Sequence, residues 1–152
     1  MTQSEFEIFV GVSTGHFEPL IRKCEQLAPQ YRFFGQIGSG EFTPSFPFVR
    51  VLPLKTLKEI MGRAEVVVTH AGTGMLSLCY EMQKRTVVIP KQRRYGESND
   101  GQVELGRRWC EIGLGVFCPD VNDLQTAIEK ARRFERATVP FPPLGQKILS
   151  LL

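Results

Sequence analysis

Two short segments of the chain carry residue types that suit the binding of phosphates and sugars. The first is Thr69-His-Ala-Gly-Thr-Gly74, which lies between a run of valines and a helix-like segment. Its small residues allow close approach to the backbone, and the free N–H groups of a helix start favour a phosphate or diphosphate. The same pattern fits a tight turn whose glycines serve only packing, and the spacing alone does not choose between the two.

The second segment is the polar stretch 90–102, which follows another apolar strand-like run. Its three basic residues could neutralise a diphosphate, and three of its polar residues could hydrogen-bond sugar hydroxyls. The basic residues are Lys91, Arg93 and Arg94, and the polar ones are Glu97, Asp100 and Gln102. The alternative is a solvated loop leading into a helix whose first-turn acids favour the helix dipole.

His16 follows the first strand-like segment and its turn, and it is the candidate for a catalytic base. A lone histidine in such a place can equally be a hydrogen-bonded structural residue. The only other histidine is His70, and the four cysteines form no C-x-x-C pair. We therefore predict no metal site.

Strand-like and helix-like segments alternate along the chain, and they must position these residues. Short runs rich in β-branched and aromatic residues predict strands at 6–12, 31–37, 48–52, 65–70, 86–90 and 115–118. Apolar residues at helical spacing predict helices at 17–28, 56–64, 73–83, 99–112 and 121–133, the last capped by Asp120 or Asn122.

The valine-rich strands indicate the kind of sheet. Val66–Val68 and Val87–Ile89 are apolar at consecutive positions, which is typical of strands covered on both faces by helices. We therefore expect an α/β fold with a doubly wound, mostly parallel, Rossmann-like sheet. Ligands of such sheets bind beyond the carboxyl ends of the strands, near the point where strand order reverses. Four loops follow the carboxyl ends of predicted strands and are candidates for this site: 13–16, 38–40, 69–74 and 90–102.

Composition excludes several classes of protein. The 19 basic residues are balanced by 16 acidic ones, which leaves a net charge of only +3. Composition therefore does not favour nucleic acid as a partner. The acidic N-terminus predicts no targeting peptide, and no apolar stretch approaches the ~18 residues of a spanning helix. The cysteines are expected to be small core residues of a protein in a reducing compartment. The chain is thus predicted to be soluble and cytoplasmic.

The length suits one domain. We predict one domain at 1–140, to which the family resemblance described next assigns the binding of a nucleotide sugar, followed by an apolar tail at 141–152 that docks on a partner or folds back on this domain.

Several blocks of the chain resemble a known family. They are Val12-Ser-Thr-Gly-His-Phe-Glu-Pro-Leu-Ile21, Gln36-Ile-Gly38, Thr69 through Gly74, and Pro90 through Gln102. They resemble the glycosyltransferase family 28 C-terminal domain, in particular its short stand-alone form, the PssE-like subunits of exopolysaccharide synthesis. The chain is also similar to the soluble subunit of the eukaryotic dolichol-pathway UDP-GlcNAc transferase. The resemblance runs without gaps from about residue 8 to 118.

The resemblance implies half of a two-part inverting GT-B glycosyltransferase. This half would bind the UDP-sugar donor, and a membrane-anchored subunit would bind a lipid-linked acceptor and hold this chain at the inner face of the membrane. No metal or other cofactor is implied, because the helix dipole and basic side chains serve the leaving diphosphate. His70, Gly72, Thr73 and Gly74 would bind the diphosphate, and Glu97, Asp100 and Gln102 the donor sugar. Thr14 and Arg93 complete the candidate substrate-binding residues, and His16 is the candidate base.

The chain departs from the family pattern at several positions. Ser13 stands where the family commonly has Gly, and Met75 and Leu78 stand where it often has Ser and Glu. The missing Glu would bind the ribose hydroxyls, and Glu81, one turn further along the helix, is a possible substitute. Ser98 and Gly101 replace common histidines. These departures favour a second function, a non-catalytic activating or stabilising subunit of a glycosyltransferase. The fold alone also allows a third, a nucleotide sensor or other small-molecule binder.

Overall fold

The structure is a computed structural model that describes residues 5–13, 15–97 and 99–135. Its centre is a six-stranded sheet with the order β3-β2-β1-β4-β5-β6, in which every strand pairs in parallel with its neighbours. The strands are β1 (Ile8–Gly11), β2 (Phe33–Gln36), β3 (Phe48–Val49), β4 (Val66–Thr69), β5 (Thr86–Val88) and β6 (Val116–Phe117). The predicted parallel sheet is confirmed.

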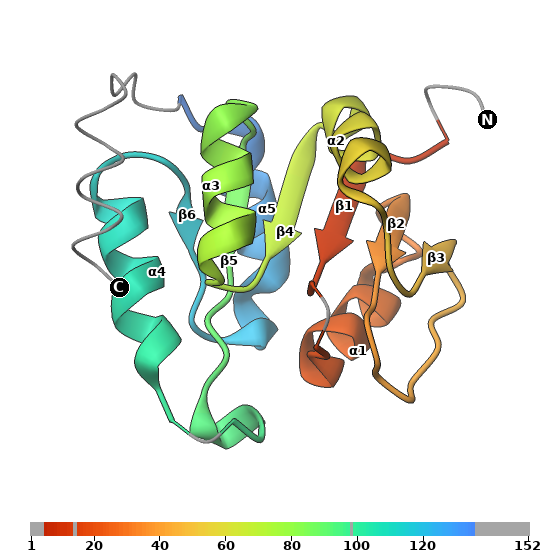
Figure 1. The fold of residues 1–152 in the computed structure, drawn as a ribbon, viewed down its shortest axis with the longest axis horizontal. Helices are drawn as coiled ribbons and strands as arrows, with labels where there is room; N and C mark the ends of the chain where they lie inside the picture. The colour runs from red at the N-terminus through yellow and green to blue at the C-terminus, as the bar shows by residue number, and fades with distance from the viewer. Residues whose placement is uncertain (1–4, 14, 98, 136–152) are drawn as a thin grey trace.

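The sheet is doubly wound, and its order reverses between β1 and β4. The chain moves outward from β1 to β3, returns to pair β4 with β1, and continues outward to β6. Gly11 pairs with Gln36 on one side and Thr69 on the other, so three central strands end at the same level. The carboxyl ends of β1 and β4 point to the lower side of Figure 1, toward the loop that joins β5 to α4. This edge is where a ligand of such a sheet is expected.

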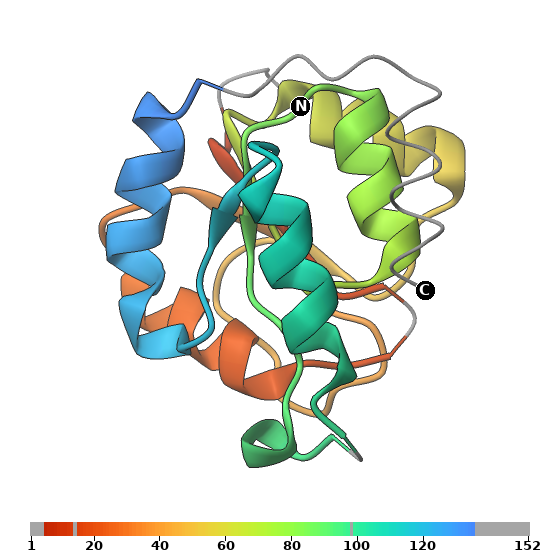
Figure 2. The same cartoon turned by 90° about the vertical axis from the view of Figure 1, so that its left-hand side faces the viewer.

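Helices cover both faces of the sheet (Figures 1 and 2). Helices α1 (Glu18–Leu27) and α5 (Leu124–Arg133) pack on one face, and α2 (Leu54–Arg63), α3 (Thr73–Glu81) and α4 (Gly101–Glu111) pack on the other. Each face of the sheet has its own hydrophobic core. Val66 and Val68 belong to the core with α1 and α5, and Val67 belongs to the core with α2, α3 and α4. All three are buried, which explains why the strand is apolar at consecutive positions.

Some boundaries differ from the prediction. Helix α2 begins at Leu54, directly after Pro53, rather than at residue 56, and α4 begins at Gly101 rather than 99. The strands are shorter than the apolar runs from which they were predicted, because the backbone pairing between neighbouring strands ends before the apolar residues do. A 3-10 turn, Arg93–Tyr95, lies in the predicted loop, and another, Val121–Asp123, precedes α5. The Asp120 carboxylate caps the second turn by accepting from the Asn122 N–H at 2.9 Å.

None of the four cysteines forms a disulfide in the described part of the chain. Cys24, Cys79 and Cys118 are buried as expected of core residues, whereas Cys110 is only partly buried. None of the helices in the described part of the chain is long and apolar enough to cross a membrane. The predicted tail at 141–152, and with it the domain boundary at 140, lies outside the described residues.

Candidate functional site

The turn after β1 is held by the side chain of Gln36 at the end of β2. The Gln36 Oε1 accepts from the backbone N–H groups of Val12 and Ser13, at 3.2 and 2.8 Å. Its Nε2 donates to the carbonyls of Ser13 and Arg50. Ser13 takes a φ of +65°, in the left-handed region that glycine adopts most readily. This conformation gives a physical reason for the glycine that the family commonly has at this position.

The turns after β1 and β2 pack directly on each other. Gly38 also has a φ of +65°, and a Cβ there would lie 1.7 Å from the carbonyl oxygen of Gly15. The same carbonyl accepts from the Ser39 N–H at 2.9 Å. The Arg50 guanidinium binds the carbonyls of Gly38 and Gly40. One edge of the site is therefore preformed. Thr14 lies outside the described residues.

The start of α3 is open. Its N-cap is Gly72, and among the described residues no side chain caps it. The first N–H groups of a helix have no acceptor within the helix, and they carry the positive end of its dipole. Thr73 and Gly74 are exposed, and a Cβ built at Gly74 would meet nothing within 4 Å. The predicted turn and helix start are thus present, and no described side chain covers Thr73 and Gly74 at this start.

His70 packs against this helix start. A Cβ at Gly72 would lie 2.3 Å from the His70 Cε1, so the ring occupies the space that the glycine leaves. His70 is buried, and burial lowers the pKa of its imidazole to about 4, with the nearby Lys91 charge acting in the same direction. The ring is therefore neutral at pH 7. Its Nε2 has no hydrogen-bond partner among the residues that the structure describes.

The 90–102 segment folds back onto this helix start through Gln102. The Gln102 Oε1 accepts from the backbone N–H groups of Ala71 and Lys91, at 3.1 and 3.0 Å. Its Nε2 lies 3.3 Å from the His70 Nδ1. The two polar segments identified in the sequence therefore form one site. The Gln102 Nε2 keeps a second hydrogen for a ligand.

Lys91 is the basic residue of the segment that reaches this site. Its Nζ lies against Gly15, 3.2 Å from where a Cβ would stand, and its charge acts on His70. Lys91 thus stands between the β1 turn and α3. In the described part of the chain no ion pair engages it. Sequence analysis selected Arg93 rather than Lys91 as a substrate-binding residue, because the contact that distinguishes Lys91 joins separate loops.

The two neighbouring arginines have other surroundings. Arg94 pairs with Asp120 at 3.7 Å and, with Gln92 and Tyr95, ties the 3-10 turn to residues 119–121. Arg93 is exposed, and its backbone N–H donates to the Asp100 Oδ1 at 2.8 Å. Asp100 therefore uses one carboxylate oxygen to hold the turn, and no hydrogen bond from a described residue engages the other. Glu97 is partly exposed at the end of the same turn.

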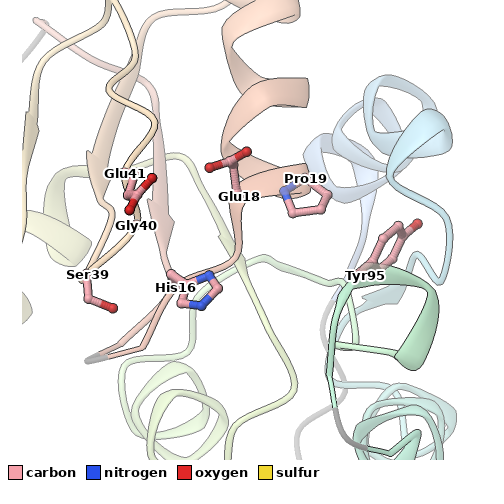
Figure 3. A pocket seen from close by; sticks show the side chains of 7 residues that line it. All are labelled: His16, Glu18, Pro19, Ser39, Gly40, Glu41 and Tyr95. Atoms are coloured by element: carbon pink, nitrogen blue, oxygen red, sulfur yellow. The ribbon is translucent and has the colours of Figure 1, made fainter.

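His16 lies in a separate hollow of about 510 Å³. Figure 3 shows its ring between Ser39 and Tyr95, with the carboxylates of Glu18 and Glu41 on the same side. The hollow is lined by His16, Glu18, Pro19, Ser39, Gly40, Glu41 and Tyr95. Tyr95 is held by the Val121 N–H, which donates to its hydroxyl at 3.0 Å. No basic lysine or arginine stands among these described lining residues, so this hollow suits hydroxyl groups better than phosphates.

A smaller, more apolar hollow of about 80 Å³ adjoins the β1 turn and α3. Its lining residues are Ser13, Gln36, Val51, Leu52, Leu57 and Met75. Val51, beside it, is 66% exposed, and Leu54 at the start of α2 is 61% exposed. Sequence analysis missed this hollow. Its signal was the apolar run that continues past β3 into the loop before α2.

The carboxylate that the family pattern leads one to expect on α3 is absent. Leu78 is buried in the core. Glu81 is the last residue of α3, far along the helix from its start, and its carboxylate pairs with Lys58 at 3.3 Å. Glu81 is therefore committed to α2 and is poorly placed to bind a ligand at the start of α3.

A sequence model of the glycosyltransferase family 28 C-terminal domain matches residues 8–140. The chain belongs to this family. The match spans both polar segments and all six strands. No curated protein is similar enough in sequence to be matched to the chain.

Solved structures show the same fold. The chain is similar to the glycotransferase of kitacinnamycin, with a TM-score of 0.61, 15% identity, and coverage of 99% of this chain and 39% of that one. It is similar to ALG13, solved by NMR, with a TM-score of 0.65, 15% identity, and 95% of each chain covered. The glycosyltransferase SsfS6 of Streptomyces sp. SF2575, solved with thymidine diphosphate, has a TM-score of 0.52, 21% identity, and 86% and 36% coverage. The chain thus spans well under half of the first and third structures and nearly all of the second.

Proposed function

We propose that this chain is the donor-binding half of a two-part inverting glycosyltransferase that uses a UDP-sugar. The observation that carries the proposal is the open start of α3 at the switch point of the sheet, with neutral His70 and the Lys91 ammonium beside it. Backbone N–H groups, a helix dipole and a cation together suit a diphosphate. The structure of SsfS6 with thymidine diphosphate supports a nucleoside diphosphate as the ligand class.

We assign the remaining parts of a sugar nucleotide to features around this helix start. The small apolar hollow beside Met75, with exposed Val51 at its rim, suits a nucleobase ring. Asp100, Glu97 and Gln102 belong to the segment that contacts the start of α3 through the hydrogen bond between Gln102 and Ala71. We assign these three residues to the donor sugar, and Arg93 and Thr14 to its surroundings.

The chemistry follows from the charge that develops on the departing UDP. As the bond to the sugar breaks, negative charge grows on the diphosphate, and donors already fixed in place stabilise it without reorganisation. The Lys91 ammonium and the N–H groups of Thr73 and Gly74 serve this purpose. No metal is needed for it. His16 is assigned as the base that takes the proton of the acceptor hydroxyl, since its hollow opens at the same edge of the sheet.

We further propose that a membrane-anchored subunit supplies a lipid-linked acceptor, in polysaccharide or glycolipid synthesis. The chain covers 39% of the kitacinnamycin enzyme but 95% of ALG13, which is the proportion expected of one half of a GT-B protein. The chain would then act at the inner face of the membrane through its partner.

Calorimetry with UDP tests the donor site. We expect Lys91→Ala to weaken UDP binding about 10-fold, because it removes a charge-assisted contact of roughly 1.5 kcal/mol. Lys23→Ala on α1, which removes the same charge from the other face of the sheet, is the matched control and should leave the affinity unchanged. Equal effects of the two substitutions would mean that the lysine acts only through net charge.

A second function is favoured by one observation, the burial of Leu78 where a ribose-binding Glu is usual. The chain would then be a non-catalytic subunit that activates or stabilises a transferase. No detectable binding at millimolar UDP, with and without the partner, would establish this alternative over the first.

A further inference from the structure

The orientation of the Gln102 side-chain amide is fixed by two backbone groups. The N–H groups of Ala71 and Lys91 both point at one end of the amide, at 3.1 and 3.0 Å. Only the oxygen accepts hydrogen bonds, since an NH2 group there would face two other donors. Because the oxygen is placed in this way, the amide nitrogen must be the end that faces His70.

This orientation decides where the proton of His70 resides. The Gln102 NH2 group can only donate, and its nitrogen lies 3.3 Å from the His70 Nδ1. The Nδ1 must therefore present its lone pair, and a neutral imidazole then carries its single proton on Nε2. The ring is kept neutral by burial and by the nearby Lys91 ammonium, which lower its pKa to about 4.

The Nε2 edge of the ring has no acceptor among the described residues. His70 is only 8% exposed, and the Nε2 is buried without a hydrogen-bond partner in that part of the chain. It lies at the start of α3, since a Cβ on Gly72 would stand 2.9 Å from it. A buried N–H donor normally has a partner, and the element next to this nitrogen is the start of α3, whose first backbone N–H groups have no acceptor within the helix.

We propose that Gln102 is a positioning residue that fixes the proton of His70 on Nε2, so that a neutral ring N–H donates to an anionic oxygen bound at the start of α3. The identity of that oxygen, a phosphate oxygen of UDP, rests on the proposed function, whereas the tautomer does not. Lys91 then supplies charge, and His70 supplies a directed hydrogen bond that stays the same throughout the neutral pH range. The family resemblance placed Gln102 on the donor sugar, and the contacts here add this second role.

Nitrogen NMR of the ring tests the tautomer directly. The chain has two histidines, so His16→Gln leaves His70 as the single signal in ¹⁵N-histidine-labelled protein. At pH 7 we expect the chemical shift of a bare nitrogen at Nδ1 and of a protonated nitrogen at Nε2. A protonated Nδ1, or an average of the two tautomers, would overturn the proposal.

The substitution Gln102→Glu tests the positioning role, because it should change which ring nitrogen of His70 carries the proton while it keeps the shape of the side chain at position 102. Its carboxylate can accept from Ala71, Lys91 and the ring, so we expect the Nδ1 to become protonated and the pKa of His70 to rise. UDP affinity should fall at least 10-fold. The matched control is Gln26→Glu, the same change on an exposed position of α1, which should alter neither the ring signals nor the affinity.

The outcomes distinguish the positioning role of Gln102 from the proposed function of the chain. An Nδ1 that stays unprotonated in the Gln102→Glu protein would overturn the positioning role. Lack of UDP binding by the wild-type chain would instead overturn the proposed function, but it would not affect the assignment of the His70 tautomer by NMR. If UDP binds to both proteins equally although the ring signals change, His70 does not donate to the diphosphate, and that part of the proposal is lost.

Discussion

At the scale of single residues, His70 makes the stability of the fold depend on pH. The pKa of its imidazole is lowered from 6.5 to about 4 by burial, so between these values the unfolded chain binds a proton that the folded chain does not. The stability contributed by the neutral ring is complete above pH 6.5 and is lost as the pH falls toward 4. Between pH 7 and 5 we expect a loss of about 2 kcal/mol in the free energy of unfolding.

Urea unfolding of the wild-type and His70→Gln proteins at the two pH values measures this loss. The variant should show a smaller decrease, because glutamine does not titrate. Identical decreases in both proteins would show that His70 is not the group responsible.

Ser13 is a second residue whose local conformation has a measurable consequence. Its φ of +65° is unfavourable for a residue with a side chain, and glycine relieves this strain while losing some backbone entropy. We expect Ser13→Gly to raise the free energy of unfolding by about 0.5–1 kcal/mol. Ser39→Gly, at a position without positive φ, should not stabilise the protein. A gain of equal size at both positions would contradict the strain argument.

At the scale of elements, the start of α3 is the feature on which donor binding depends. Gly74 faces open space, so Gly74→Val should be tolerated by the fold and should fill the region where a diphosphate would approach the N–H groups. We expect UDP affinity to fall by at least about 10-fold, or 1.4 kcal/mol, while the urea midpoint stays the same or rises because Gly is a poor helix former. Ser77→Val, an exposed position one turn along the same helix, is the control. Retained UDP affinity in the Gly74→Val protein would contradict a ligand at this helix start.

The elements themselves could be predicted from the sequence, and the contacts between loops could not. Valines at consecutive positions indicated a strand buried on both faces, and the glycine-rich turn at 69–74 indicated the start of α3. The hydrogen bonds that shape the site join residues far apart in the chain: Gln36 binds Ser13 across 23 positions, and Gln102 reaches His70 across 32. No local pattern encodes such pairs. For the same reason the position of Lys91 beside Gly15 and near His70 emerged only from the three-dimensional arrangement.

At the scale of the whole molecule, the chain has the size of one half of a GT-B enzyme. If the other half is a separate subunit, the apolar segment 141–152, outside the described residues, is a candidate for the contact between them. We expect deletion of 141–152 to reduce the amount of partner that co-purifies with this chain, and UDP affinity to remain unchanged. Undiminished co-purification would refute a docking role for the segment.

The central claim is that a UDP-sugar is bound through its diphosphate at the start of α3. The most direct measurement is a titration of the ¹⁵N-labelled chain with UDP, followed by the backbone amide signals. The account predicts saturable shifts that are largest for Thr73, Gly74 and Met75, with smaller ones at Lys91. No saturable shift at millimolar UDP, or the largest shifts on a distant element such as α5, would contradict it.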